Sequence, residues 1–294
     1  MGHDKLRKFA ENEGFSCLLQ PSAADILADG YFAMRDQAVK GHWNETMFDE
    51  PRPIVLELGC GKGEYTIDLS RRIPSRNYIG VDIKGARLWK GAKYAHENRL
   101  GNVAFLRTRI EFLPALFAEG EVSEIWLTFS DPQLKSENAR LTSPVFLERY
   151  RRFLRPGGVV HLKTDSRFLY EYSLAVARCN GLRVLAATSD LYGTPPEALF
   201  AEPSASPSCP TASSSSCPTA SSSSCPTRSG IPSQTQALYE VQTFYERMFR
   251  AQGYKICYLS FILDGTQPLA HPDFDAAYWR SVEGPRHFIT PPSE

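Results

Sequence analysis

The chain has 294 residues, of which 42% are hydrophobic and 22% charged, and its 33 basic and 33 acidic side chains cancel. This length provides for one large hydrophobic core or two modest ones, and the lack of any run near 18 apolar residues argues against a membrane-spanning helix. The opening MGHDKLRKFAENEGF has no apolar signal-peptide core, and seven cysteines without paired spacing do not suggest a disulfide framework. We therefore expect a cytoplasmic protein.

The predicted secondary structure alternates strands and helices, which is typical of an α/β protein. Predicted strands lie at Ile54–Leu58, Tyr78–Asp82, Val103–Arg107, Glu124–Phe129, Gly158–Thr164, Arg183–Ala187 and Lys255–Leu263. Predicted helices lie at Glu64–Arg72, Lys84–Arg99, Glu111–Phe117, Pro144–Leu154, Ser166–Cys179 and Thr235–Gln252. These elements fit a single domain at 53–193 and 236–264, with an N-terminal extension at 1–52 and a tail at 265–294.

The first predicted strand ends in a glycine-rich turn. Residues 54–63 read IVLELGCGKG, an apolar run followed by an acid and three glycines at alternate positions. Glycines at such a turn let the backbone pass close to a ligand where a Cβ would collide. Asp82 ends the next strand, about 20 residues further on, where a nucleotide ribose needs a hydrogen-bond acceptor. Strand, glycine turn, helix, strand and acid together indicate a nucleotide-cofactor site.

The stretch from Arg71 to Arg109 holds ten basic residues and two acidic ones, so its net charge of +8 is balanced by −8 elsewhere. Its most regular part repeats a basic residue at every third position of a predicted helix, at Lys84, Arg87, Lys90 and Lys93. Such a stripe suits a phosphate backbone, and the interleaved Trp89 and Tyr94 suit stacking on bases. A solvated helix face accounts for the same charges.

Two aspartates follow neighbouring predicted strands. Asp131 lies just after the fourth strand and Asp165 just after the fifth. Because ligands gather at the carboxyl ends of parallel strands, we expect both acids to face one cleft. The alternative is that Asp131 begins a turn before Pro132 and that Asp165 caps the helix that opens at Ser166.

Residues 194–235 consist largely of Pro, Ser, Thr and Ala, and contain the octad CPTASSSS twice in succession. This repeat is too short and too polar to build a stacked core, so we expect a disordered insertion within the domain. The cysteines that open the copies, Cys209, Cys217 and Cys225, are eight residues apart with no histidine nearby. That spacing matches no zinc pattern, and no metal is expected.

Four motifs stand at the strand ends and in the last predicted helix. They are Val55-Leu56-Glu57-Leu58-Gly59-Cys60-Gly61-Lys62-Gly63, Phe129-Ser130-Asp131-Pro132 with Lys135, Thr164-Asp165, and Thr243-Phe244-Tyr245-Glu246. Many methyltransferases share the first motif, but the combination and order resemble the bacterial tRNA (guanine-N7)-methyltransferases. The resemblance runs from the opening of the chain to the end of the last strand. It leaves out the Ser/Pro insertion and the tail after about Asp264.

The resemblance implies a seven-stranded Rossmann-like methyltransferase sheet with helices on both faces and an antiparallel last strand. It implies S-adenosylmethionine as cofactor, without metal, and methyl transfer to N7 of a variable-loop guanine in tRNA. The implied cofactor-binding residues are Glu57, Gly59, Gly61, Asp82 and Thr108. The implied catalytic residue is Asp131, and the implied substrate-binding residues are Lys135, Asp165, Thr243 and Glu246. For the last two, an ordinary helix-surface pair at i,i+3 is the alternative.

Two departures from the family pattern concern tRNA binding. Gln133 stands where the family commonly has tryptophan, and the dense basic run that follows in many members keeps only Lys135 and Arg140. Our hypothesis is that the basic stripe at 84–93 compensates for the missing charges.

Three other functions share parts of this pattern. A nicotinamide dehydrogenase has the strand, the glycines and the acid, but the third glycine of its fingerprint comes one residue later. A methyltransferase acting on protein or a small molecule keeps the cofactor half and needs a different cleft. A non-catalytic RNA-binding relative keeps the fold, but the intact Glu57, Asp82, Asp131 and Asp165 argue against loss of activity.

Overall fold

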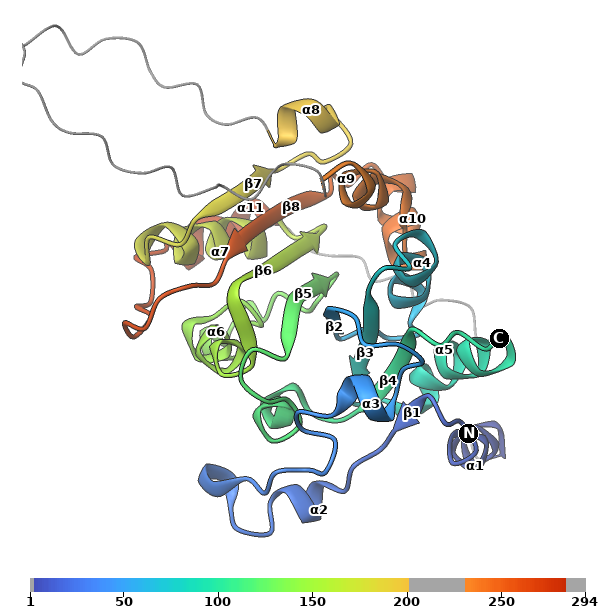
Figure 1. Cartoon of the computed structure of the whole chain (residues 1–294). Helices are drawn as coiled ribbons and strands as arrows, with labels where there is room; N and C mark the ends of the chain where they lie inside the picture. Colours follow the sequence, from blue (N-terminus) through green and yellow to red (C-terminus); the bar gives the residue numbers. More distant parts are fainter. Residues whose placement is uncertain (1–2, 201–230, 284–294) are drawn as a thin grey trace, which may run out of the picture.

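The computed structural model describes residues 3–200 and 231–283, and its centre is one sheet with the strand order β1-β4-β3-β2-β5-β6-β8-β7 (Figure 1). The strands are β1 (Leu18–Leu19), β2 (Ile54–Leu58), β3 (Asn77–Asp82), β4 (Val103–Arg107), β5 (Val122–Thr128), β6 (Leu154–Thr164), β7 (Val184–Thr188) and β8 (Cys257–Ile262). All neighbours are parallel except that β8 runs antiparallel to both β6 and β7. The order reverses between β2 and β5, which is where ligands bind in such sheets.

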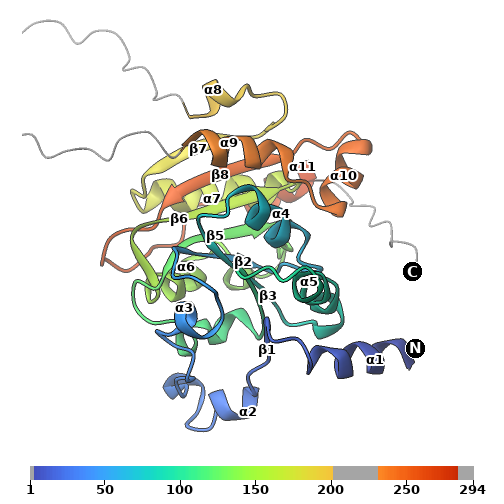
Figure 2. The ribbon, with the colours of Figure 1, turned by 45° about the vertical axis from the view of Figure 1, so that its right-hand side comes forward.

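Helices cover both faces of the sheet (Figure 2). The longer ones are α1 (His3–Asn12), α4 (Glu64–Arg72), α5 (Gly85–Glu97), α6 (Pro144–Arg151), α7 (Arg167–Cys179), α9 (Ile231–Glu240), α10 (Phe244–Ala251) and α11 (Ala276–Glu283). The short ones are α2 (Ala23–Ile26), η1 (Tyr31–Ala33), α3 (Trp43–Thr46), η2 (Ile110–Ala115), η3 (Glu137–Ala139) and α8 (Pro196–Leu199).

Strand β2 is buried on both sides, which explains its continuous apolar run. Val55 belongs to the core that also contains side chains of α4, α9 and α10. Leu56 belongs to the opposite core, with side chains of η2, α6 and α7. Because successive side chains of a strand point to opposite faces, both faces of β2 need apolar residues. Its carboxyl end is thereby fixed at the centre of the molecule.

The predicted α/β architecture is confirmed, including the seven expected strands and the antiparallel last strand. The sheet has one strand more, the two-residue β1, which pairs with the outer edge of β4. Two residues are too few to show a periodicity, so this strand could not be predicted from the sequence pattern. Through β1, the N-terminal segment lies against the core, and α1 packs on α5.

Two predicted helices differ from the structure. The single helix predicted at Thr235–Gln252 is wrong, because α9 ends at Glu240 and α10 starts anew at Phe244. The helix predicted at Glu111–Phe117 is the 3-10 helix η2, in which Pro114 lacks the N–H that an α-helix would use. Because of the first error, the prediction did not identify Thr243 as the residue that caps α10.

The predicted insertion is bounded by helices. Helix α8 and the start of α9 fall within its predicted limits, 194–235, whereas Cys209, Cys217 and Cys225 lie outside the described residues. In the two described ranges, no group of three or more His, Cys, Asp or Glu side chains could hold a metal ion. Nor does any helix there combine the length and apolarity needed to cross a bilayer.

Candidate active site

The buried carboxylate of Glu57 stabilises the turn after β2 through hydrogen bonds. Glu57 accepts hydrogen bonds from the backbone N–H of Thr66 on α4 (2.9 Å) and from the hydroxyl of the same residue. Its other oxygen accepts from the hydroxyl of Thr128, at the end of β5 (2.6 Å). Burial raises the pKa of Glu57 to about 7, although these donors favour the charged form. The side chain thus joins β2, α4 and β5 around the glycine turn.

Asp82 closes the other side of that turn. One carboxylate oxygen accepts from the backbone N–H of Gly61 (2.9 Å) and the other from that of Lys84 (2.7 Å). Its backbone oxygen accepts from the N–H of Thr108 (3.2 Å). A carboxylate has about four acceptor positions, so Asp82 retains capacity for a further donor. The structure therefore brings Gly61, Asp82 and Thr108 together, as the sequence predicts.

The first two glycines of the turn face open space. Gly59 has φ 80° and Gly61 has φ 59°, and at either one an added Cβ would meet nothing within 4 Å. Gly63 differs, because its Cβ would lie 2.5 Å from the ring of Phe105. The third glycine therefore serves core packing, whereas the first two leave room for a ligand. Ile83, the first residue after β3, has an exposed fraction of 55% and adds an apolar surface beside this space.

Asp131 lies in a loop with two strained backbone positions. Phe129 (φ 52°) and Gln133 (φ 46°) both adopt the left-handed region, which is uncommon for non-glycine residues and concentrates at functional sites. Asp131 is exposed, and one of its oxygens accepts from the N–H of Gln133 (2.9 Å). This bond forms the expected turn and fixes the carboxylate without burying it. Close by, Ser130 Oγ is buried and has no hydrogen-bond partner within the described ranges.

The loops that carry the two aspartates leave the sheet at one edge. Strands β5 and β6 are adjacent and parallel, with Thr128 opposite Lys163. The N–H of Phe129 then donates to the backbone oxygen of Lys163 (2.8 Å), so the pairing continues into the loop. Asp131 and Asp165 follow this pairing closely on their own strands. They therefore project from neighbouring strand ends.

Asp165 is half-buried and does not cap α7. The capping residue is Ser166, whose hydroxyl accepts from the N–H of Leu169 (3.0 Å). The capping alternative for Asp165 is therefore wrong.

Thr243 and Glu246 are joined by a helix cap rather than by surface contact. Thr243 Oγ1 accepts from the N–H of Glu246 (3.1 Å) and starts α10. Glu246 is fully buried, where it forms an ion pair with Lys163 (2.9 Å) and accepts from the hydroxyl of Tyr192 (2.6 Å). The helix-surface alternative is therefore wrong. Burial lowers the pKa of Lys163, and contact with Glu246 opposes that shift.

The two basic residues that remain after the Asp131 loop have different positions. Lys135 is exposed, whereas Arg140 is buried, with its guanidinium over the rings of Phe168 (4.7 Å) and Tyr172 (4.2 Å). Arg140 also donates to the backbone oxygen of Gln133 (3.3 Å). Arg140 therefore orders the loop and is not available to a phosphate. Of these two residues, only Lys135 has its charge on the surface.

Within the basic stripe on α5, Lys84, Arg87 and Lys90 are exposed. Trp89 is not free to stack on a base. Its ring nitrogen donates to Glu11 (2.7 Å), and cationic groups of α1 and α5 lie over its ring. Tyr94 keeps 37% of its surface exposed. The charges of the predicted stripe are thus on the surface, but one of its two aromatic residues is not.

Comparison with known proteins agrees with this site. Residues 51–198 match the sequence model of a family described as "Putative methyltransferase". A tRNA (guanine-N(7)-)-methyltransferase of Bacteroides fragilis is 40% identical over 277 residues, which cover 94% of this chain and 92% of the relative. The chain belongs to the tRNA (guanine-N(7)-)-methyltransferase family.

Two further matches complete this comparison. A tRNA (guanine-N(7)-)-methyltransferase of Christiangramia forsetii is 51% identical over 191 residues, or 64% of this chain and 83% of that protein. Among solved structures, the 16S rRNA methyltransferase KamB has a TM-score of 0.49 at 16% identity and covers 78% of this chain and 95% of that chain. The fold assignment rests on the sheet order and not on this last match.

The glycine turn fits S-adenosylmethionine, the cofactor of this tRNA (guanine-N(7)-)-methyltransferase family member. The open space beside Gly59 and Gly61 accommodates a ligand against the backbone, and Asp82 can accept from ribose hydroxyls.

The sequence analysis missed Lys163, which holds the buried Glu246. One signal was available. A lysine inside the otherwise apolar strand Gly158–Thr164 is rarely buried without a carboxylate partner, so an acid elsewhere in the chain had to meet it.

Proposed function

We propose that this chain transfers the methyl group of S-adenosylmethionine to N7 of a guanine in tRNA. The observation that carries the proposal is its end-to-end similarity to tRNA (guanine-N(7)-)-methyltransferases in a chain whose cofactor turn and two aspartates share one sheet edge. The methyl group of the bound sulfonium is already activated for displacement. Guanine N7 has an in-plane lone pair and carries no proton at neutral pH. The protein therefore needs no general base.

Catalysis then consists mainly of positioning. Holding N7, the methyl carbon and sulfur in line accounts for up to about 7–11 kcal/mol of the barrier. Phe129 and Gln133 support this reading, since their strained backbone fixes the loop that carries Asp131. A rigid loop is what catalysis by positioning requires.

The two aspartates act on the guanine. A carboxylate can accept from both the N1–H and the 2-amino group of guanine, and adenine lacks this pair of donors. As positive charge develops on the purine during transfer, a nearby anion stabilises it. We assign the catalytic role to Asp131, because it is exposed and its carboxylate is oriented by the N–H of Gln133. Asp165 binds the same base from the neighbouring strand end.

The remaining residues act around this centre. Glu57, Gly59, Gly61, Asp82 and Thr108 form the cofactor turn, and the exposed Lys135 binds a phosphate of the tRNA. Thr243 and Glu246 act indirectly, because the cap and the ion pair with Lys163 hold α10 beside the turn. By family resemblance, the target is a variable-loop guanine, and the protein acts in the cytoplasm.

One experiment separates this function from the alternatives. The protein is incubated with radiolabelled S-adenosylmethionine and, in separate reactions, bulk tRNA or bulk protein. We expect label in tRNA only, followed by chain cleavage at N7-methylguanine after borohydride and aniline treatment. Label in the protein fraction would favour a protein methyltransferase. Cofactor and tRNA binding without any transfer would favour a non-catalytic RNA-binding relative.

A further inference from the structure

The segment that follows β8, residues Asp264–Glu283, is tied to the domain along its length, and we call it the C-terminal strap. Its first residue accepts a hydrogen bond on its side chain from the N–H of Gly157 (2.8 Å). Arg151 of α6 donates to the backbone oxygens of Asp264 and Gln267, both at 2.7 Å. The strap therefore starts from a fixed point at the end of the sheet opposite the candidate active site.

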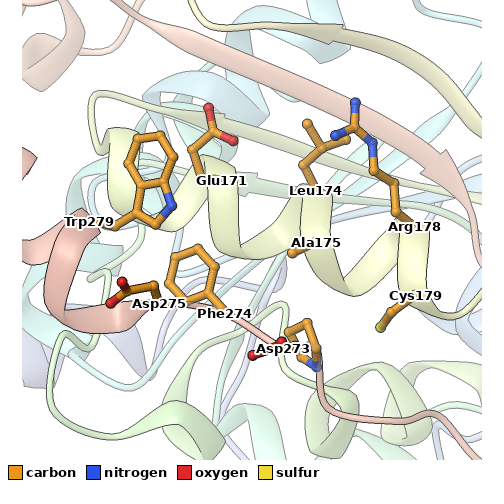
Figure 3. A pocket seen from close by; sticks show the side chains of 10 residues that line it. Glu171, Leu174, Ala175, Arg178, Cys179, Asp273, Phe274, Asp275 and Trp279 are labelled. Carbon is orange, nitrogen blue, oxygen red and sulfur yellow. The ribbon is translucent and has the colours of Figure 1, made fainter.

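The middle of the strap is held at the end of α7, where Ala270 and Asn180 exchange two hydrogen bonds (2.7 and 2.9 Å). Phe274 meets Phe168 and Tyr172 edge-on, with ring centroids 5.4 Å apart in both cases. Beside this contact lies an open hollow of about 440 Å³ between the strap and α7 (Figure 3). The labelled side chains on the helix are Glu171, Leu174, Ala175, Arg178 and Cys179, and those on the strap are Asp273, Phe274, Asp275 and Trp279. Beyond the hollow, α11 packs on α7, and polar contacts at the far end of the strap add to this attachment.

The far end of the strap reaches the candidate active site. Glu283 accepts from the hydroxyl of Ser166 (2.6 Å) and the N–H of Phe168 (2.9 Å), at the first turn of α7. A carboxylate in that position satisfies free N–H groups and interacts favourably with the helix dipole. One turn earlier on α11, Arg280 donates to the backbone oxygen of Leu134 (3.1 Å). A single short helix therefore links two separate segments of the fold.

Those two segments are the ones that carry the aspartates. Ser166 directly follows Asp165, and Leu134 lies in the loop of Asp131. We propose that Glu283 and Arg280 are positioning residues, which set the separation of Asp131 and Asp165 across the guanine. This inference rests on the proposed function and adds to it a structural element that lies outside the matched residues 51–198.

The expected effect follows from the geometry of methyl transfer. Loss of either anchor frees one loop relative to the other, and misplacement of a reacting group by about 1 Å costs on the order of 10²-fold in rate. The cofactor turn lies between β2 and β3, and its carboxylates bond Gly61 and Thr66 rather than residues of α11, so cofactor affinity should not change. A fall in turnover at constant cofactor affinity is therefore the signature of positioning.

The test uses the full chain, four single variants and the Glu283→Ala/Arg280→Ala double variant. Glu283→Ala and Arg280→Ala each remove one anchor, Glu283→Gln keeps an acceptor for the N–H of Phe168, and Val282→Ala is the control. Val282 is 48% exposed on the same helix and belongs to neither anchor. For each protein we would measure kcat and KM on bulk tRNA, the Kd of S-adenosylmethionine and the melting temperature. Hydrogen exchange at the N–H of Gln133 would report the order of the Asp131 loop.

We expect the two alanine variants at the anchors to lose about 10- to 100-fold in kcat, with the cofactor Kd within twofold of wild type and faster exchange at Gln133. Glu283→Gln should lose less, and Val282→Ala should match wild type. A kcat within twofold of wild type in the Glu283→Ala/Arg280→Ala double variant would overturn the inference. So would a parallel loss of kcat, cofactor affinity and melting temperature, which marks a general structural role.

Failure of the proposed function gives a different result. In that case the wild-type protein itself methylates no tRNA, whereas failure of this inference leaves an active wild type and equally active variants. Arg280 is exposed and bonds a single backbone oxygen, so Arg280→Ala should fold even if Glu283→Ala does not. The exchange rate at Gln133 in that variant then decides whether the strap holds the loop.

Discussion

The cofactor turn and the substrate edge of this protein are built in different ways. The turn is formed mainly within one strand-helix-strand unit, where Asp82 accepts from the N–H of Gly61 and Glu57 accepts from Thr66. Contacts with Thr108 and Thr128 join this unit to the ends of β4 and β5. The substrate edge consists of the loops after β5 and β6, the cap of α10 and the end of α11. Its contacts join residues as far apart as Leu134 and Arg280, 146 positions along the chain. Binding of the cofactor is thus encoded locally, whereas catalysis depends on distant segments.

If this contrast is correct, the largest effect should come from the substrate edge without any change at the turn. We expect Asp131→Asn to lower kcat by roughly 10²- to 10³-fold, because an anion that stabilises the developing charge is lost. The Kd of S-adenosylmethionine, measured by calorimetry, should stay within twofold of wild type. Asp36→Asn is the matched control, since Asp36 is exposed and, among the residues that the structure describes, forms its ion pair with Lys40 alone (2.7 Å). A variant that keeps a third of wild-type turnover would remove Asp131 from the catalytic role.

The pH dependence of folding stability tests how burial of Glu57 affects the cofactor turn. Its pKa rises from an ordinary 4.5 to about 7 on folding, so the folded state favours the protonated form. The stability that this provides is complete below pH 4.5 and is lost as the pH rises through 7, a change of about 3 kcal/mol. We expect the unfolding free energy of wild type, from urea titrations without cofactor, to fall by that amount relative to Glu57→Gln between pH 4.5 and 8. Parallel pH curves for the two proteins would contradict this expectation.

Substitutions in the basic stripe test whether tRNA affinity depends on residues outside both the cofactor turn and the substrate edge. Substitution of Lys84, Arg87 and Lys90 by Glu should weaken tRNA binding by roughly tenfold to a hundredfold at 0.1 M salt, because phosphate contacts release counterions. The slope of log Kd against log salt should become shallower by up to about 3 units. Charge reversal at three exposed arginines elsewhere, Arg155, Arg178 and Arg183, changes the net charge equally and is the control. Equal losses in both triple variants would mean that only overall charge matters.

The smallest expected effect is a loss of cofactor affinity when a single methyl group is added at the glycine turn. Gly61→Ala should weaken S-adenosylmethionine about tenfold, since the new Cβ enters the open space where the ligand lies. Gly120 is the matched control, because it also has positive φ (72°) and its Cβ would likewise meet nothing within 4 Å. Both variants should lose about 1–2 kcal/mol of stability from the left-handed backbone. Equal cofactor affinity in the two would show that the space beside Gly61 is not the binding site.

The sequence predicted most of the sheet, and also the glycine turn with its two acids, for a physical reason. Buried parallel strands are continuous apolar runs, and a glycine turn followed by an acid is a spacing that can be read directly. Glu246 and Glu283 could not be placed in this way, because no periodicity relates them to Lys163 or Ser166. The cap at Thr243 was readable, since Thr-x-x-Glu marks a helix start, but a long helix was predicted across it.

The buried pair of Lys163 and Glu246 has a consequence for how such sequences can change. Either residue replaced alone leaves an uncompensated charge in the interior, at about 3–5 kcal/mol, whereas an apolar pair of similar volume would be tolerated. Close relatives should therefore keep both residues or exchange both. A sequence in which only one of the two residues has changed encodes a poorly folded protein. Lys163 and Glu246 should therefore change together during evolution.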